Sequence, residues 1–509
     1  MPQKMRILVQ DKSLMQFRYL VSILFIILGS CIASAQQGSF MPVDPFQASG
    51  QKTTPDTTAV PPGMIENAVL FEKEPRSHLV DVIMDRWAEC CDPEIPIAYW
   101  QAGPTAKGEK PETAPKKKAW YEKLGIRGYA QLRYNFTIDE RDGSAPAQYT
   151  ADSSVGDNKS FLLRRARLII FGDVSEHLGL YLQPDFASTP NGSVDNIQFA
   201  QIRDWYGDWY LDKEKVFRFR LGQSKVPYGW ENMQSSSNRL ALDRSDPINS
   251  SVKNERDLGI FFYWTPEYAQ KFFIDVIEQG LKGSGNYGVF ALGVYNGQGG
   301  SLAETNDNLH SVIRLTLPHQ LSNGQYVEAS VQAYSGFYTV YSAQIRANGA
   351  GPLIRPAGTL ETGNRQGWLD QRIAGTFVWY PQPIGIQAEW MAGEGPALNE
   401  TQTAIENRPV NGGYVQAMYK YDTCNHGILF PFIRWQYYRG GYKSERNAPY
   451  ARVDEWEAGL EWQINPQVEL VTMYTLTDRT NTTAYTDAGV QSYQQFEGQL
   501  LRVQLQFNY

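Results

Sequence analysis

The chain has 509 residues and a formal net charge of −7, with 13% aromatic residues, 20% charged residues and a mean hydropathy of −0.43. Because nucleic-acid-binding proteins favour basic patches, this acidic balance argues against a nucleic-acid partner. Beyond the N-terminus, no apolar run approaches the roughly 18 residues of a membrane-spanning helix. That excludes a helical membrane protein, but it does not exclude a barrel of half-apolar strands.

Residues 1–35 have the pattern of a secretory signal peptide. A basic stretch precedes a short apolar core, Tyr19–Leu28, and Ala33-Ser34-Ala35 fits a small-residue cleavage site. The alternative is a lipoprotein signal at Leu28–Cys31, in which Cys31 carries lipid. Both interpretations predict that the protein is exported.

Residues 36–119 differ in composition from the rest of the chain. Their flanks are rich in Pro, Thr, Gln and Lys, which predicts solvated linkers. Between the flanks, apolar residues at helical spacing predict a short amphipathic helix over Pro75–Cys91. We expect a periplasmic extension whose helix docks on the barrel, on a neighbouring subunit or on another periplasmic component. The alternative is a poorly ordered tail.

The sequence has no catalytic or metal-binding pattern. Its four cysteines lack metal-ligand spacing, and the neighbours Cys90 and Cys91 are either small thiols or a redox or intermolecular disulfide pair. Five scattered histidines, with no HExxH, GxSxG or Walker pattern, make a barrel enzyme a poor hypothesis. We therefore expect no enzyme, no metal and no cofactor.

From residue 120 to residue 509 the hydrophobic pattern has a period of two, in about sixteen runs. In runs such as Tyr326–Tyr338 and Gln499–Tyr509, one face suits lipid and the other suits water. Short and long connections alternate, and the chain ends on an aromatic residue, Tyr509. A soluble sheet explains the alternation but not these features together. The prediction is an all-β fold: an antiparallel transmembrane β-barrel of about 16 strands in the outer membrane.

Two connections stand out from this scheme. Thr265–Gly285 is a long insertion where a short periplasmic turn is expected. Within it, the apolar run Phe272–Ile277 predicts an extra strand. Residues 225–256 form a long polar, basic loop between two strands, and loops of this length are more often functional than idle. In a membrane barrel this loop can fold inward and narrow the pore with its Arg and Lys side chains.

Three stretches resemble the phosphate-selective porin O/P family. They are Phe161–Leu168 running on to Tyr181–Ala187, Leu221–Gly229, and Ser235–Arg244 followed by Arg256–Gly259. The resemblance covers roughly residues 120–509. It implies sixteen-stranded homotrimeric barrels with the third external loop folded inside, and a lumen that favours anions. Phosphate selectivity is an implication of this resemblance.

The candidate anion-binding residues come from the loop and from strand parity. The loop contributes Lys225, Arg239, Arg244, Lys253 and Arg256, and the strands contribute Arg165, Arg167, Arg218 and Arg220. Rows of fixed cations select anions, and Arg offers forked donors to phosphate. However, inward carboxylates such as Glu328, Glu455 and Glu457 are nearly as numerous, so many of these arginines are expected to pair with them.

The sequence therefore predicts an outer-membrane porin for passive diffusion of small hydrophilic solutes. Its expected partners are small anions or phosphate and outer-membrane lipid. The alternative is a structural or adhesion barrel with little conduction, which an open or plugged lumen would distinguish.

Overall fold

The computed structural model describes residues 119–140, 149, 155, 161–188, 198–349, 351–480, 485–487, 490–492 and 495–509. The predicted signal peptide, Cys31, and the extension through residue 118 with its helix Pro75–Cys91 lie outside the described residues.

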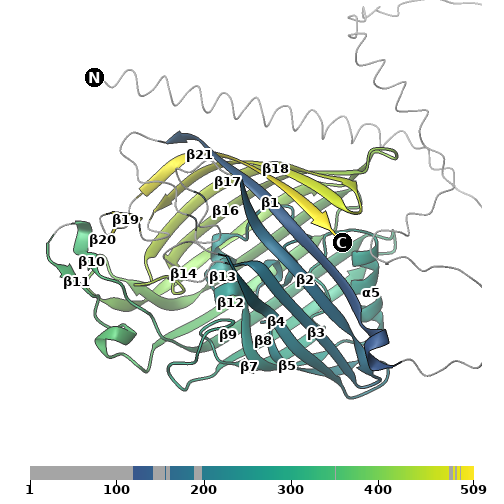
Figure 1. Ribbon diagram of the computed structural model, residues 1–509, viewed down its shortest axis with the longest axis horizontal. Helices are drawn as coiled ribbons and strands as arrows, with labels where there is room; N and C mark the ends of the chain where they lie inside the picture. The colour runs from purple at the N-terminus through teal and green to yellow at the C-terminus, as the bar shows by residue number, and fades with distance from the viewer. Residues whose placement is uncertain are drawn as a thin grey trace, which may run out of the picture. The chain divides into compact units, whose positions relative to one another are not determined.

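Sixteen antiparallel strands close into one barrel (Figure 1), as the sequence predicts. β1 pairs with both β2 and β21, which joins the first strand to the last. The strands are β1 (Gly125–Glu140), β2 (Phe161–Ser175), β3 (Leu178–Ser188), β4 (Phe199–Tyr210), β5 (Phe217–Lys225), β6 (Arg256–Trp264), β7 (Phe290–Tyr295), β8 (His310–Gln320), β9 (Tyr326–Tyr338), β12 (Trp368–Trp379), β13 (Ile384–Leu398), β14 (Ile405–Tyr419), β16 (Ile428–Gly441), β17 (Tyr450–Asn465), β18 (Val468–Thr480) and β21 (Gln495–Asn508).

Smaller elements lie in the connections between these strands. β15 (Tyr421–Asp422) follows β14 and pairs with β16. β10 (Ile345–Arg346), β11 (Leu353–Ile354), β19 (Tyr485–Asp487) and β20 (Val490–Ser492) form a separate small sheet. The helices are η1 (Trp120–Lys123), α3 (Trp230–Met233), α4 (Asp246–Asn249), η2 (Lys253–Glu255), α5 (Glu267–Glu278), η3 (Ala347–Gly349) and η4 (Leu360–Thr362). None of the helices in these described ranges is long and apolar enough to cross a membrane.

The barrel wall buries polar side chains and exposes apolar ones, the reverse of a soluble protein. Along β8, Arg314 is 1% exposed while Leu317 is 62% exposed, and along β12, Arg372 is 2% exposed while Ile373 is 54% exposed. Alternate residues of a strand point to opposite faces, so the polar set faces the lumen. The apolar outer face matches a hydrocarbon surrounding.

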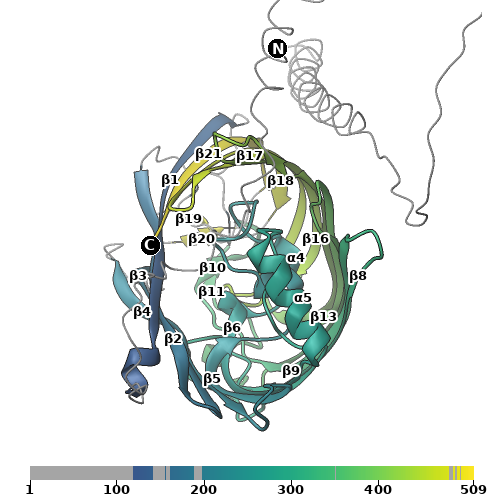
Figure 2. The same cartoon turned by 90° about the vertical axis from the view of Figure 1, so that its right-hand side faces the viewer.

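One end of the barrel carries short connections, which we call the short-turn end. These connections are residues 176–177, 211–216, 321–325, 380–383, 423–427 and 466–467. Most loops at the other end are longer, and the one between β5 and β6 spans residues 226–255. We call residues 226–255 the inner loop. Figure 2 shows α4 of this loop, and α5, within the ring of strands.

The insertion after β6 is a helix, so the prediction of extra strand at Phe272–Ile277 is wrong. Ala269, Phe272, Phe273 and Val276 are the buried residues of α5, and they recur at the i, i+3, i+4, i+7 spacing of an amphipathic helix. They form a cluster with Tyr326, Val378 and Tyr380, three buried residues on the lumen-facing parity of β9, β12 and the turn that follows β12. A short apolar run does not reveal its period when it is read alone.

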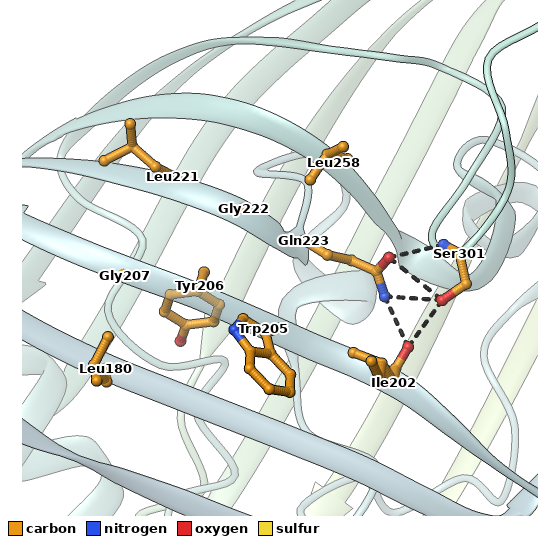
Figure 3. Close-up of a pocket in the computed structure, with 10 residues that line it drawn as sticks. All are labelled: Leu180, Ile202, Trp205, Tyr206, Gly207, Leu221, Gly222, Gln223, Leu258 and Ser301. Carbon is orange, nitrogen blue, oxygen red and sulfur yellow. Dashed lines mark hydrogen bonds between the residues drawn. The ribbon is translucent and has the colours of Figure 1, made fainter.

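An apolar groove lies on the outer face of β3–β6, as Figure 3 shows. Trp205, Leu221 and Leu258 line it, and all three are exposed. Gly207, which pairs with Leu221, contributes no side chain there, so the surface is hollowed. The groove belongs to the lipid-facing set of residues and is separate from the polar lumen.

Candidate constriction site

The inner loop is held to the barrel wall by its carboxylates. Glu231 pairs with Arg434 of β16 at 2.7 Å. Asp246 pairs with Arg479 of β18 at 2.8 Å. A buried carboxylate is costly unless it is paired and hydrogen-bonded, so each pair fixes the loop at a defined point of the wall.

Asp243 makes the third attachment. Its carboxylate lies 3.1 Å from Arg133 of β1 and 2.6 Å from Arg502 of β21. Burial raises the pKa of Asp243, but the charges of Arg133 and Arg502 outweigh that effect and hold the pKa well below its usual range. β16 stands eight strands from β5, directly across the sixteen-stranded barrel, and β18, β21 and β1 stand six, five and four strands from β5, so the inner loop spans the lumen.

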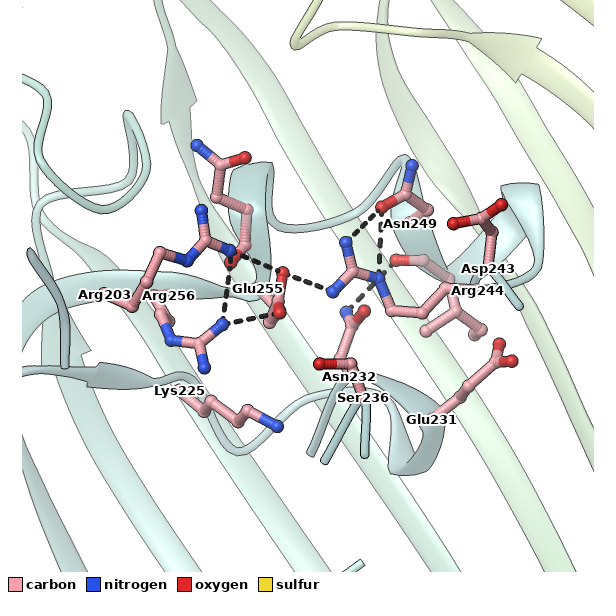
Figure 4. A network of polar contacts seen from close by, with 12 residues as sticks. Arg203, Lys225, Glu231, Asn232, Ser236, Asp243, Arg244, Asn249, Glu255 and Arg256 are labelled. Carbon is pink, nitrogen blue, oxygen red and sulfur yellow. Dashed lines mark hydrogen bonds and ion pairs between the residues drawn. The ribbon is translucent and has the colours of Figure 1, made fainter. Parts of the chain in front are cut away.

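Glu255 gathers three arginines at the far end of the loop (Figure 4). It pairs with Arg256 at 2.5 Å, with Arg203 at 3.5 Å and with Arg244. Burial raises the pKa of Glu255, but Arg244, Arg256 and Arg203 together hold it well below its usual range. Glu255 therefore stays ionised and fixes all three guanidinium groups.

One side of the inner loop is packed with apolar groups. Val226, Tyr228, Ile248 and Val252 of the loop form one buried cluster with lumen-facing residues of β6 to β17. Tyr228 meets Tyr334 edge to face, with ring centroids 4.7 Å apart. We call this side, toward β6–β17, the packed side.

The other side of the loop faces β1–β4 and carries polar and charged groups; we call it the wet side. Ser236 contacts Tyr129 at 2.7 Å, and Arg167 donates to Ser236 at 3.1 Å. The side chains of Arg164 and Arg203 are 24% and 12% exposed, and that of Arg244 is 14% exposed. Their carboxylate partners Asp243 and Glu255 are only 5% and 7% exposed, so water reaches the cations more than the anions.

The structure brings most of the predicted site residues to this side. Arg244 and Arg256 meet at Glu255. Lys225 lies near this group and donates to the backbone oxygens of Met233 and Gln234, at 2.9 and 2.8 Å. Arg167 pairs with Asp185 at 2.8 Å.

Arg165 and Arg239 differ from the other predicted residues. Arg165 donates to Gln131 at 2.7 Å, and Arg239 donates to the backbone oxygen of Ala241 at 3.2 Å. Neither has a carboxylate partner among the residues that the structure describes. Arg239 lies close enough to repel Arg165 electrostatically. Burial and then the charge of Arg244 lower the pKa of Arg239 to about 10, so it remains a cation at neutral pH.

Three predicted residues lie apart from this group. Arg220 makes a two-pronged contact with Asp208 at 2.8 and 2.9 Å, and Arg218 lies 3.8 Å from the same carboxylate. Both belong to β5 near the short-turn end. Lys253 donates to the backbone oxygen of Ser444 at 3.1 Å, in the connection after β16.

Sequence reasoning missed the carboxylates that position the inner loop. The missed residues are Glu231, Asp243, Asp246 and Glu255, together with the wall arginines Arg133, Arg164, Arg203 and Arg479. A signal was present, because residues 225–256 hold five cations against four carboxylates. A loop so nearly balanced is not a purely basic constriction. Within the described ranges, no group of three or more His, Cys, Asp or Glu side chains could hold a metal ion.

Comparison with known proteins gives one family match. The model of the family described as "Phosphate-selective porin O and P" matches residues 131–509. No curated protein matches the chain.

Among solved structures, the chain is similar to OmpT, an outer membrane protein of Vibrio cholerae (9% identity, TM-score 0.44), with coverage of 76% of this chain and 97% of that one. It is also similar to the outer membrane channel DcaP of Acinetobacter baumannii (12% identity, TM-score 0.43), with coverage of 76% and 97%. A third is an anion-selective porin from Comamonas acidovorans (10% identity, TM-score 0.40), with coverage of 76% and 99%.

Proposed function

The chain belongs to the phosphate-selective porin O and P family, and from this premise we propose that it is an anion-leaning diffusion channel. It is an outer-membrane porin, and its family and fold indicate a channel rather than an enzyme. The proposed activity is passive diffusion of small hydrophilic solutes, with anions preferred and phosphate among them.

The observation that carries the proposal is the exposure of charges on the wet side. Arg164, Arg203 and Arg244 keep part of their surface in water, while Asp243 and Glu255 lie beneath them. In a narrow passage with low-dielectric walls, the sign of the exposed charge sets the local ion concentration. Buried carboxylates that are already paired offset less of that field than their number suggests.

Arg165 and Arg239 are the proposed contact points for phosphate. Two guanidinium groups without carboxylate partners in the described part of the chain repel each other, and a bound anion relieves that repulsion. Arg also presents forked donors that match phosphate oxygens. The other predicted cations of the wet side already have partners, as Lys225, Arg167 and Arg256 show.

The proposal includes three features that rest on the sequence. Residues 1–35 direct export, residues 36–119 form a periplasmic segment, and the barrel assembles as a homotrimer in contact with outer-membrane lipid. The trimer rests on the family resemblance alone.

A structural or adhesion barrel with little conduction is the second candidate. One observation favours it: the buried cluster around Val226, Tyr228 and Ile248 fills the packed side of the lumen. The two candidates differ in whether the wet side conducts.

Planar-bilayer current in potassium chloride with added phosphate tests the proposal. We expect millimolar phosphate to reduce the chloride current of the wild type, and Arg165→Gln with Arg239→Gln to weaken that block about tenfold, because two charge-assisted contacts are lost. The matched control is Arg408→Gln, which changes an arginine near the start of β14 that pairs with Glu400 of the preceding loop. Conduction that is indifferent to phosphate in all three proteins would leave a general porin, and no conduction would favour the structural candidate.

A further inference from the structure

The connection between β6 and β7, residues 265–289, crosses the lumen instead of turning back at once. Its helix α5 packs against lumen-facing residues of β9 and β12. The chain then runs through Gly280–Gly285 before it returns to β7. Leu281, Lys282 and Ser284 in this stretch are buried.

Lys282 reaches the opposite wall of the barrel. Its ammonium group pairs with Glu461 of β17 and lies 4.9 Å from the ring centre of Phe430 of β16. β17 stands eight strands from β6 in either direction around the sixteen-stranded barrel. The connection between β6 and β7 therefore reaches across the full diameter of the barrel. Both partners are buried, at 3% and 1% exposure, so the pair is shielded from competing water.

The backbone of this segment is adapted to the crossing. Lys282 has φ of +64°, a conformation that costs free energy for a residue with a side chain and persists only where its surroundings require it. A Cβ at Gly283 would lie 2.6 Å from Val276 of α5, so only glycine fits there. At the far wall, Lys420 donates to the backbone oxygen of Gln279 at 2.5 Å.

The same segment touches the inner loop. Gln234 donates to the backbone oxygen of Lys282 at 2.6 Å, and Asn238 donates to that of Gly283 at 2.8 Å. Trp230 of α3 belongs to the buried cluster that includes Phe272 and Phe273 of α5. Residues 234–239 of the inner loop, which include Arg239, are thus supported from the short-turn end.

We propose that residues 265–289 form a crossbar that restricts the pore on the short-turn side of the inner loop. The ion pair of Lys282 and Glu461 latches the crossbar, and the crossbar holds residues 234–239 in place. The pore then has two restrictions in series. The inner loop sets the charge preference, and the crossbar sets the size limit. The role in charge preference rests on the proposed function, whereas the size limit requires only that the porin conducts.

The test uses the full-length protein, with single-channel conductance and the swelling of liposomes in sugars of increasing size. In one variant, residues 266–287 are replaced by a short turn like the other connections at that end. In a second variant, Lys282→Met removes the latch. The matched control is Lys271→Met, which removes a lysine from the exposed face of α5, where it pairs with Asp275. Heat-modifiable mobility on a gel reports whether each barrel is folded.

We expect the shortened variant to conduct about twofold more than the wild type and to admit larger sugars, because conductance follows the narrowest open section. Lys282→Met should show frequent transitions to that larger conductance, and Lys271→Met should match the wild type. If the shortened barrel folds and keeps the wild-type conductance and size limit, the proposal is overturned.

A charge-swap pair covers the case in which the shortened barrel does not fold. Lys282→Glu places two carboxyl groups together and should show the same transitions as Lys282→Met, and Lys282→Glu with Glu461→Lys should restore the wild-type conductance because the ion pair is rebuilt. If Lys282→Glu keeps the wild-type conductance, the proposal is overturned. The proposed function has a separate test. The ion preference of the wild type is measured as a zero-current potential, which does not depend on the size limit.

Discussion

The two sides of the inner loop use opposite chemistry for opposite tasks. The packed side buries tyrosines and aliphatic residues against β6–β17, so it fixes the loop and excludes water. The wet side faces β1–β4 with serines and arginines, and its carboxylates lie beneath the cations. The difference shows that the loop divides the lumen into a filled part and a charged part. Anchoring and ion preference can therefore be altered separately.

The largest effect on stability is expected from a change at Asp243, which attaches the inner loop to β1 and β21. Asp243→Asn removes the carboxylate that Arg133 and Arg502 share, although Arg502 keeps Glu457 at 3.4 Å, and removal of one partner of a buried pair costs on the order of 3–5 kcal/mol. The free energy of unfolding from urea titration in lipid vesicles should fall by that amount, and current recordings should become noisy. Glu176→Gln, at an exposed pair with Lys213 on a short turn, is the control and should match the wild type. A quiet, fully stable Asp243→Asn would mean that the loop is held by its packed side alone.

The packed side is tested at Tyr228, which is completely buried. Tyr228→Ala should cost about 3 kcal/mol because it opens a cavity against Tyr334. The hydroxyl of Tyr228 has no hydrogen-bond partner in the described part of the chain, so Tyr228→Phe should be neutral or slightly stabilising. The same urea titration measures both variants. Equal losses for Ala and Phe would show that the hydroxyl, and not the ring, holds the loop.

Lowering the pH should have the smallest effect on the conductance and on the current noise. The pKa values of Asp243 and Glu255 are held well below their usual range, because nearby arginines outweigh burial. A carboxyl with a lowered folded-state pKa contributes stability that is complete above its unfolded value of about 4 and is lost as pH falls through the folded value. Conductance and noise should therefore be the same at pH 7 and pH 5 and should change only well below pH 4. A transition between pH 7 and pH 5 would assign the anchoring to other groups.

The strands could be predicted from the sequence because a wall between lipid and water imposes a strict period of two. Tyr326–Tyr338 is predicted and observed with the same bounds. At the start of β17 the polarity reverses instead of following the lipid-facing pattern, because Ala451 and Val453 are buried whereas Arg452 and Asp454 are exposed. α5 was missed because its apolar run is too short to distinguish the two periods.

The site was less predictable than the fold. Strand parity indicates which arginines point inward, but it does not indicate their partners. Arg434 and Glu231 are 203 positions apart, and only the path of the inner loop across the barrel brings them together. Likewise, the sequence does not distinguish Arg239, which lacks a carboxylate partner in the described ranges, from Arg244, which pairs with Glu255.

The zero-current potential across a potassium chloride gradient tests the central claim most directly, namely that exposed cations over buried carboxylates make the wet side prefer anions. Wild-type protein should give an anion-selective potential. A variant with Arg164→Gln, Arg203→Gln and Arg244→Gln should lose most of that preference while it keeps its conductance within about twofold. A cation-selective or unselective wild type, or a triple variant with an unchanged potential, would contradict the account.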